Sequence, residues 1–170
     1  MQFKRKLLGR TDYRKRLELV KSRLPRLVVR KSLKNLLAQI VEYHENGDKV
    51  IVSASTKELE KKFSLKTSKK NIPASYLLGL LIGKKSLSKG IKKVILDLGM
   101  YRSIKGSKLY AVLKGALDAG LEIPHEKTIL PSQDRLEGKH ISAHYQKANK
   151  QLKVPDLGKH INEIKAKILK

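Results

Sequence analysis

The sequence has no cysteine, so disulfide bonds, thiolate metal sites and a cysteine nucleophile are excluded. It has no tryptophan either, and only six tyrosines and two phenylalanines, so base stacking is not the dominant way in which this chain binds a partner. No apolar stretch reaches the roughly 18 residues that a transmembrane helix needs, and the first residues lack the apolar segment of a secretory signal. We therefore expect a soluble, cytoplasmic protein.

Acidic residues are scarce. The 170 residues include 15 aspartates and glutamates against 39 lysines and arginines, which gives a formal net charge of +24. A charge of this size repels itself in the folded state and attracts partners that are rich in phosphate. Nucleic acid is the first candidate partner, and an anionic membrane surface is its competitor. Residues 1–34 alone hold 13 lysines and arginines against Asp12 and Glu18, so the charge is concentrated near the N-terminus.

Residues 1–25 predict a basic arm with one short helix that ends near Pro25. Thr11 can cap this helix, because its hydroxyl can accept a hydrogen bond from an amide of the first turn. Four residues recur at helical spacing and form a narrow stripe that can dock on the rest of the protein: Tyr13, Leu17, Val20 and Leu24. The basic residues of the helix would then point away from the body: Arg14, Lys15, Arg16 and Lys21.

Residues 26–124 predict the core domain, which begins with three antiparallel strands. The strands are expected at residues 26–30, 35–43 and 49–55. Asn46-Gly47 is a strong hairpin signal, because both turn residues must tolerate positive φ. The charged stretch that follows, residues 56–72, predicts a short helical turn and a loop.

The second half of the core predicts a helix, a strand and another helix. Pro73 suits the first turn of a helix, and four residues give that helix an apolar face: Leu77, Leu78, Leu81 and Ile82. The apolar run at residues 92–98 is typical of a strand covered on both faces. Residues 107–121 predict an amphipathic helix, with Ser107 as its cap and Gly120 as its stop.

Residues 125–170 predict a C-terminal extension. The chain from Pro124 to Pro155 reads as polar and irregular, and a last helix follows. Four residues lie on one stripe of this helix: Leu157, Ile161, Ile164 and Ile168. The fold class is therefore α/β, a mixed sheet in the order β-β-β-α-β-α of the ribonuclease-H-like arrangement, with a basic N-terminal arm and a helical C-terminal extension.

Three catalytic or metal-binding interpretations lack support. Gly99 and Gly106 enclose six residues, and Gly-Ser-Lys follows instead of Gly-Lys-Ser/Thr, so the phosphate loop of nucleotide hydrolases is not matched. A nuclease needs several carboxylates that converge on metal ions, whereas Asp97 stands alone and is expected to hold a strand end by hydrogen bonds. His140 and His144 have zinc-binding spacing, but no cysteine supplies a third ligand, so polar or RNA-facing histidines are the preferred interpretation.

Three stretches together resemble one family. They are the basic lead-in "FKRKLLGRTDYRKRLELVKS" (3–22), "LVVRKSLKNLLAQIVEYHENGDKVIVSAST" (27–56) and "GLLIGKKSLSKGIKKVILDLGMYRSIKGSKLYAVLKGALDAGLEIP" (79–124). The sequence resembles the large-subunit ribosomal proteins that bind 5S ribosomal RNA, number eighteen in the large-subunit series, and the lead-in and tail are similar to the archaeal and eukaryotic branch. The family's strand-end element is present here as Asp97-Leu98-Gly99-Met100-Tyr101, without its usual basic second residue.

The resemblance implies a structural constituent of the large ribosomal subunit with no catalytic activity and no cofactor. It implies binding to 5S rRNA, attachment of that RNA to the large-subunit rRNA, neighbouring ribosomal proteins as partners, and a place in the central protuberance. Basic and aromatic residues of the arm, the first strand and the turn before residue 108 are the candidate RNA-binding residues: Lys4, Arg5, Lys6, Arg10, Tyr13, Arg14, Lys15, Arg16, Arg23, Arg26, Arg30, Lys31, Lys34, Tyr101, Arg102, Lys105 and Lys108.

Each candidate has a simpler alternative. A run of charge can be a solvated, disordered tail, and the basic turn at residues 102–108 can be an ordinary surface turn. A processing nuclease on a ribonuclease-H-like scaffold and a general nucleic-acid chaperone that binds through charge alone remain competing functions.

Overall fold

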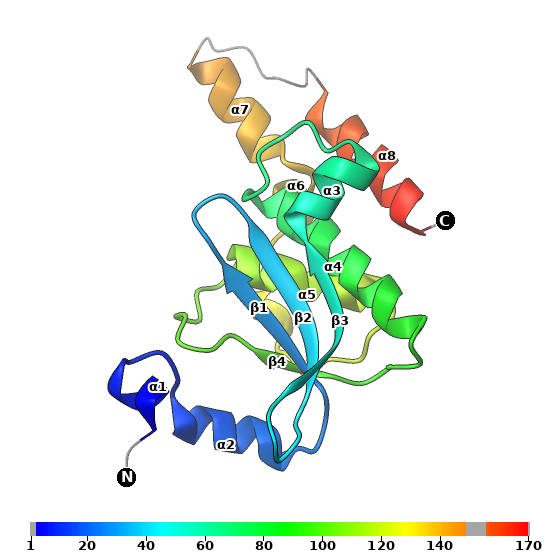
Figure 1. Cartoon of the computed structure of the whole chain (residues 1–170). Coiled ribbons are helices and arrows are strands. Elements are labelled where there is room, and N and C mark those ends of the chain that lie inside the picture. The colour runs from blue at the N-terminus through cyan, green and yellow to red at the C-terminus, as the bar shows by residue number, and fades with distance from the viewer. Residues whose placement is uncertain (1–2, 149–155, 170) are drawn as a thin grey trace.

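The computed structural model describes residues 3–148 and 156–169. A four-stranded mixed sheet forms the centre, helices cover one of its faces, and two N-terminal helices lie beyond one end of the sheet (Figure 1). The α/β class predicted from the sequence is confirmed.

The sheet contains the three predicted antiparallel strands and one parallel strand. The strands are β1 (Arg26–Lys31), β2 (Leu36–Glu42), β3 (Lys49–Ser55) and β4 (Ile95–Asp97). Their order in the sheet is β3-β2-β1-β4, with β4 parallel to β1. Leu27 of β1 is paired with Ile40 of β2, and Ile40 is paired with Val52 of β3. These three cross-strand neighbours point to the same face of the sheet, and all three are buried.

The last strand differs from the prediction. β4 has only three residues and lies at the sheet edge, where Ile95 and Leu96 are half-buried. The prediction of a long strand covered on both faces was therefore wrong. The earlier residue Lys93, which was predicted to belong to this strand, instead forms an isolated parallel bridge with Glu122.

Helices α3 (Thr56–Phe63), α4 (Ile72–Leu87) and α5 (Lys108–Asp118) complete the core. The side chain of Asn71 caps α4 by accepting a hydrogen bond of 2.8 Å from the amide of Ala74. α4 is buried on all sides from Ile72 to Gly83, because the sheet covers one side and other helices cover the rest. It lies so close to α5 that a Cβ atom on Gly79 would be 2.1 Å from the carbonyl oxygen of Val112.

The segment after Pro124 is more helical than predicted. It contains a 3-10 turn, η1 (Lys127–Ile129), followed by α6 (Gln133–Glu137) and α7 (Lys139–Lys147). The prediction of an irregular stretch from Pro124 to Pro155 was therefore wrong where α6 and α7 lie, and its last residues, 149–155, lie outside the described residues. Leu136 anchors α6, because its side chain is almost fully buried against the main core.

The last helix, α8 (Leu157–Leu169), confirms its predicted stripe. Leu157, Ile161, Ile164 and Ile168 are each about 98 % or more buried and belong to the same hydrophobic core as the sheet and α4. The C-terminal part of the chain is therefore packed on α4, at the opposite end of the molecule from the N-terminal helices (Figure 1).

Candidate nucleic-acid interface

The N-terminal segment, residues 3–25, contains two short helices, α1 (Lys4–Leu7) and α2 (Tyr13–Lys21). Asp12 caps α2 by accepting hydrogen bonds from the amides of Arg14 and Lys15, so the prediction that Thr11 is the cap was wrong. The hydroxyl of Thr11 instead accepts a hydrogen bond of 3.0 Å from Arg5 Nε. This bond ties the connection between the two helices to α1.

The face by which α2 approaches the sheet is more polar than predicted. Leu17 is 56 % exposed, and no residue of α2 is fully buried. Tyr13 is half-buried, and its ring stacks on that of Phe3 at 4.8 Å between centroids. The predicted apolar stripe therefore does not by itself hold α2 against the rest of the protein.

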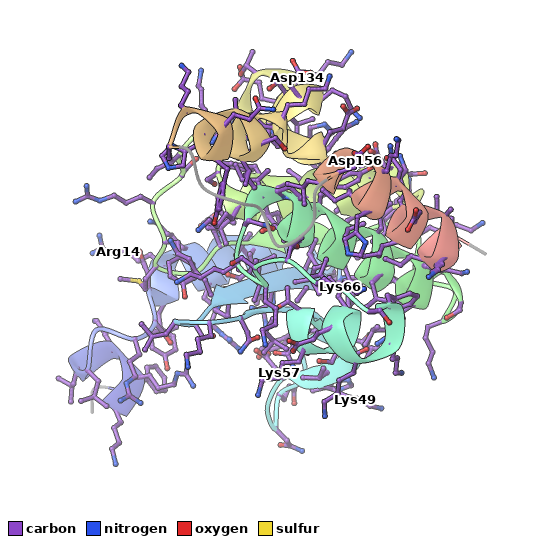
Figure 2. The ribbon with its side chains drawn as sticks, turned by 90° about the horizontal axis from the view of Figure 1, so that it is seen from above. Arg14, Lys49, Lys57, Lys66, Asp134 and Asp156 are labelled. Carbon is purple, nitrogen blue, oxygen red and sulfur yellow. The ribbon has the colours of Figure 1, made fainter. Side chains whose placement is uncertain are left out.

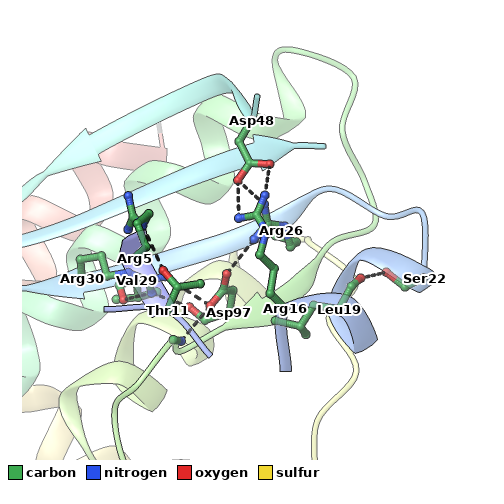
Figure 3. Close-up of polar contacts among 11 residues, drawn as sticks. Arg5, Thr11, Arg16, Leu19, Ser22, Arg26, Val29, Arg30, Asp48 and Asp97 are labelled. Carbon is green, nitrogen blue, oxygen red and sulfur yellow. Dashed lines mark hydrogen bonds and ion pairs between the residues drawn. The ribbon is translucent and has the colours of Figure 1, made fainter. Parts of the chain in front are cut away.

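An ion-pair chain connects α2 to the sheet (Figure 3). Arg16 donates two hydrogen bonds, of 2.9 and 2.8 Å, to the two carboxylate oxygens of Asp48. Asp48 also accepts a bond of 2.6 Å from Arg26, and Arg26 donates a further bond of 2.9 Å to Asp97. The prediction that Arg16 points away from the body was therefore wrong, because this side chain holds α2 against the β2–β3 hairpin.

Asp48 carries its negative charge in this arrangement. Burial by itself would raise the pKa of Asp48, but the hydrogen bonds and charges of Arg16 and Arg26 outweigh burial and lower it. Arg26 is only 3 % exposed and lies between two carboxylates, so its guanidinium group has a structural role.

Asp97 ends β4 as a hydrogen-bonding residue. Its carboxylate accepts bonds from Arg26, from Arg30 at 3.3 Å and from the amide of Gly99 at 2.8 Å. Gly99 has a φ of +60°, and a Cβ atom there would lie 3.0 Å from the guanidinium carbon of Arg30. The glycine therefore permits the turn that follows Asp97 and leaves space for Arg30 beside it.

Most of the candidate cations are exposed. Those with exposed side chains are Lys4, Arg5, Lys6, Arg10, Arg14, Lys15, Arg23, Lys31, Lys34, Arg102 and Lys105. Figure 2 shows Arg14 extending from the N-terminal helices, well apart from Lys57 and Lys66. Arg16, Arg30 and Lys108 are half-buried, and Arg26 is the one candidate cation that is buried.

A groove separates the N-terminal segment from the uncovered face of the sheet. Its volume is about 1210 Å³. Apolar side chains of the strands, such as Val28 and Val41, form part of its wall, and Arg10, Arg30 and Arg102 contribute positive charge. Carboxylates also line the groove, and two of them, Asp48 and Asp97, are hydrogen-bonded to arginines. Apolar surface beside the exposed arginines suits an unpaired stretch of RNA.

A second, smaller cavity of about 700 Å³ adjoins this groove, since Tyr101 and Arg102 line both. It brings together Lys31, Arg102 and Lys108 from the sequence-based set, while Lys105 does not line it. Tyr101 is held here by two hydrogen bonds between its hydroxyl and the backbone of Lys31, which also places the ammonium group of Lys31 4.7 Å from the ring centre.

Sequence reasoning missed two cations of this cavity, Lys70 and Arg135. Lys70 lies in the charged stretch before α4, and Arg135 lies in α6. No RNA-binding residue was predicted in either segment. Nothing in the local sequence distinguishes these two cations from the other lysines and arginines, because only the fold brings them beside Lys108.

No group of three or more histidine, cysteine, aspartate and glutamate side chains that could hold a metal ion occurs within residues 3–148 and 156–169. Over the same described ranges, no helix is long and apolar enough to cross a membrane.

Comparison with known proteins gives two concordant results. Residues 1–93 and 88–126 match the family described as "Ribosomal large subunit proteins 60S L5, and 50S L18". The chain is also 44% identical over 185 aligned positions to the large ribosomal subunit protein uL18 of Caldivirga maquilingensis, and the alignment covers 99% of this chain and 89% of the relative. The chain belongs to this family. The family resemblance predicted from the sequence is thereby confirmed.

Membership of this ribosomal family assigns the chain to the large subunit of the cytoplasmic ribosome, with ribosomal RNA and other ribosomal proteins as its partners. The excess positive charge that the fold leaves at the N-terminal end suits such a partner, because ribosomal RNA supplies the phosphates that neutralise it.

Proposed function

We propose that this structural constituent of the large ribosomal subunit binds 5S rRNA, helps to attach it to the large-subunit rRNA and forms part of the central protuberance. The observation that carries the proposal is the separation of two kinds of cation. Arg16 and Arg26 are held by short hydrogen bonds to carboxylates, whereas the cations of α1, Arg14 of α2, and Lys31 and Lys34 of the β1–β2 hairpin are exposed.

The proposed RNA contacts come from the exposed group. Phosphates of the RNA backbone can approach these side chains without displacing a carboxylate from a strong pair. The residues proposed to contact RNA are Lys4, Arg5, Lys6, Arg10, Arg14, Lys15, Arg23, Lys31, Lys34, Arg102, Lys105 and Lys108. Tyr13, Arg30 and Tyr101 line the groove and are proposed to contact ribose or bases, while Arg16 and Arg26 hold the surrounding structure in place.

The proposed division of labour uses an arm, residues 1–25, a core domain, residues 26–124, and an extension, residues 125–170. The sheet order β3-β2-β1-β4, with a parallel fourth strand, supports a ribonuclease-H-like arrangement for the core. Packing of α8 on α4 supports an extension that is anchored to this core. The core would then fix orientation while the arm follows the RNA.

The test is a competition binding measurement with the full-length chain. Labelled 5S rRNA is bound at about 0.2 M salt, and unlabelled 5S rRNA or an unrelated hairpin RNA of the same length is added. Binding through charge alone loses most of its affinity at this salt concentration and shows no preference. We expect 5S rRNA to compete at a much lower concentration than the hairpin, and equal competition would overturn the proposal.

A matched pair of variants locates the interface. Arg10→Ala removes an exposed cation of the proposed interface, and Lys57→Ala removes an exposed cation of α3, away from Arg14 in Figure 2. Affinity for 5S rRNA should fall in the first variant and stay at the wild-type value in the second. Equal losses would assign binding to net charge instead of this surface.

A further inference from the structure

The 700 Å³ cavity is a strongly positively charged concave surface. Five cations line it, from four separate parts of the chain: Lys31, Lys70, Arg102, Lys108 and Arg135. Among the described residues that line it, none is acidic. Repulsion among five positive charges without a negative partner destabilises the folded protein. An anionic ligand in the cavity would remove this repulsion.

Local structure holds these cations in the cavity. The ammonium group of Lys70 donates a hydrogen bond of 3.2 Å to the carbonyl oxygen of Leu33, which fixes the lysine beside the β1–β2 hairpin. Arg135 lies over Gly106, where a Cβ atom would be 2.9 Å from its Nη1 atom. Gly106 has a φ of +64°, so the glycine allows both the turn and the close approach of the arginine.

The first turn of α5 faces the same cavity. Ser107 is the N-cap residue and lines the cavity, yet its side chain makes no capping bond. Its Oγ atom is buried without a hydrogen-bond partner among the described residues. The first amides of any α-helix also have no partner within the helix, so a hydroxyl donor and backbone amides add to the five cations.

Electrostatic strain is present in the structure without a ligand. Burial lowers the pKa of Lys108, and repulsion from Lys70 and Lys31 lowers it further. An anion between these side chains would remove that repulsion.

The rim of the cavity indicates which anion fits. Leu33, at the tip of the β1–β2 hairpin, is 92% exposed, and Ile104 is 60% exposed. An inorganic anion gains nothing from these two apolar side chains, whereas a nucleotide can place its ribose or base on them while its phosphate enters the cavity. The cavity also adjoins the groove beside the N-terminal segment, because Tyr101 and Arg102 line both.

We propose that this cavity binds consecutive phosphates of a ribosomal RNA strand, with the attached nucleosides against Leu33 and Ile104. The inference rests on the proposed function, since it takes the RNA that lies in the groove as the strand that enters the cavity. It also gives α6 of the C-terminal part a role in binding, through Arg135.

The experiment measures how RNA affinity depends on salt. The double variant Lys70→Gln with Arg135→Gln is compared with Lys61→Gln and Lys62→Gln, which removes two exposed cations from α3. Binding of 5S rRNA and of purified large-subunit rRNA is measured between about 0.05 and 0.2 M salt. Each lost phosphate contact lowers the log–log slope by about 0.7 to 0.9, so the cavity variant should lose about 1.4 to 1.8 on one of the RNAs.

A loss on 5S rRNA identifies that RNA as the ligand of the cavity, and a loss confined to large-subunit rRNA identifies the other strand. Slopes equal to those of the α3 variant on both RNAs would overturn the proposal. A third variant, Leu33→Ser, should weaken binding severalfold at unchanged slope, because it removes an apolar contact and no charge. Unchanged affinity in this variant would refute the position assigned to the nucleosides.

Two controls separate the possible failures. If millimolar inorganic phosphate raises the melting temperature of the wild type more than that of the cavity variant, and the RNA slopes do not differ, the cavity is a free-anion site and the RNA proposal is wrong. If the wild type shows no preference for 5S rRNA over the unrelated hairpin, the proposed function fails whatever the cavity variants do. Circular dichroism should show wild-type folding in the cavity variant, because the change removes repelling charges.

Discussion

Arg14 and Arg16 lie two residues apart on α2 and should have separable roles. Arg14 is exposed, whereas Arg16 holds Asp48 with two hydrogen bonds of 2.9 and 2.8 Å. We predict that Arg14→Ala weakens RNA binding and leaves α2 in place, and that Arg16→Ala releases α2 from the sheet.

The expected size of the second effect follows from the geometry. A hydrogen bond to a charged group contributes about 1.5 to 3 kcal/mol when buried, and an exposed ion pair contributes about 0.2 to 1 kcal/mol. The side chains of Arg16 and Asp48 are 31% and 24% exposed, which lies between these limits. Loss of the pair should therefore cost about 1 to 2 kcal/mol, which corresponds to an increase of about 5- to 30-fold in the open population of α2.

Hydrogen exchange of the α2 amides measures this population directly. Exchange at residues 16–21 should accelerate about 5- to 30-fold in Arg16→Ala and stay at the wild-type rate in Arg14→Ala. In the binding assay, Arg14→Ala should lower the log–log salt slope by about 0.7 to 0.9, the value for one phosphate. Equal exchange in the two variants, or an unchanged slope in Arg14→Ala, would refute this assignment of roles.

Three further predictions concern the core and its acid sensitivity. Gly79→Ala should lose about 3 kcal/mol or more of stability, measured by urea unfolding, because its Cβ would lie 2.1 Å from the carbonyl oxygen of Val112. Gly158→Ala should be neutral or stabilising, because among the described residues the nearest atom to its Cβ would be 3.8 Å away. Leu113→Ala, at a fully buried position, should cost about 2 to 5 kcal/mol in the same assay, and an unchanged midpoint would contradict the packing of α5. The folded-state pKa of Asp48 lies below its ordinary value of 3.8, so its stabilisation is present above that pH and is lost as the pH falls through the folded-state pKa. Urea midpoints measured across that range should decline less steeply in Asp48→Asn than in the wild type.

The hydrophobic pattern predicted the parts of the fold that depend on local periodicity. The three antiparallel strands, helix α4 and the apolar stripe of α8 all follow from the spacing of apolar residues. The short helices α6 and α7 could not be predicted in this way, because helices of this length are marginal in isolation. α6 depends on the burial of Leu136 by distant parts of the chain.

The roles of individual cations were harder to predict than the overall positive surface. Arg16 and Arg26 differ from Arg14 only through Asp48 and Asp97, which lie between 22 and 71 residues away in sequence. A sequence shows the sign of a charge but not its partner, so the paired and the exposed arginines looked alike. For the same reason, the sequence did not show that Lys70 and Arg135 lie in the cavity.

The few acidic residues therefore decide which part of the basic surface is available to RNA. A phosphate that approaches Arg16 must displace the carboxylate of Asp48, which is itself hydrogen-bonded to the buried Arg26. A phosphate that approaches Arg14 displaces only water and counterions, and the release of those counterions favours binding. We therefore propose that Arg16 and Asp48 orient α2 and that the exposed Arg14 on the same helix supplies affinity for RNA. A docked helix has less conformational freedom to lose on binding than a disordered tail, so under this proposal the Arg16–Asp48 pair strengthens RNA binding without touching the RNA.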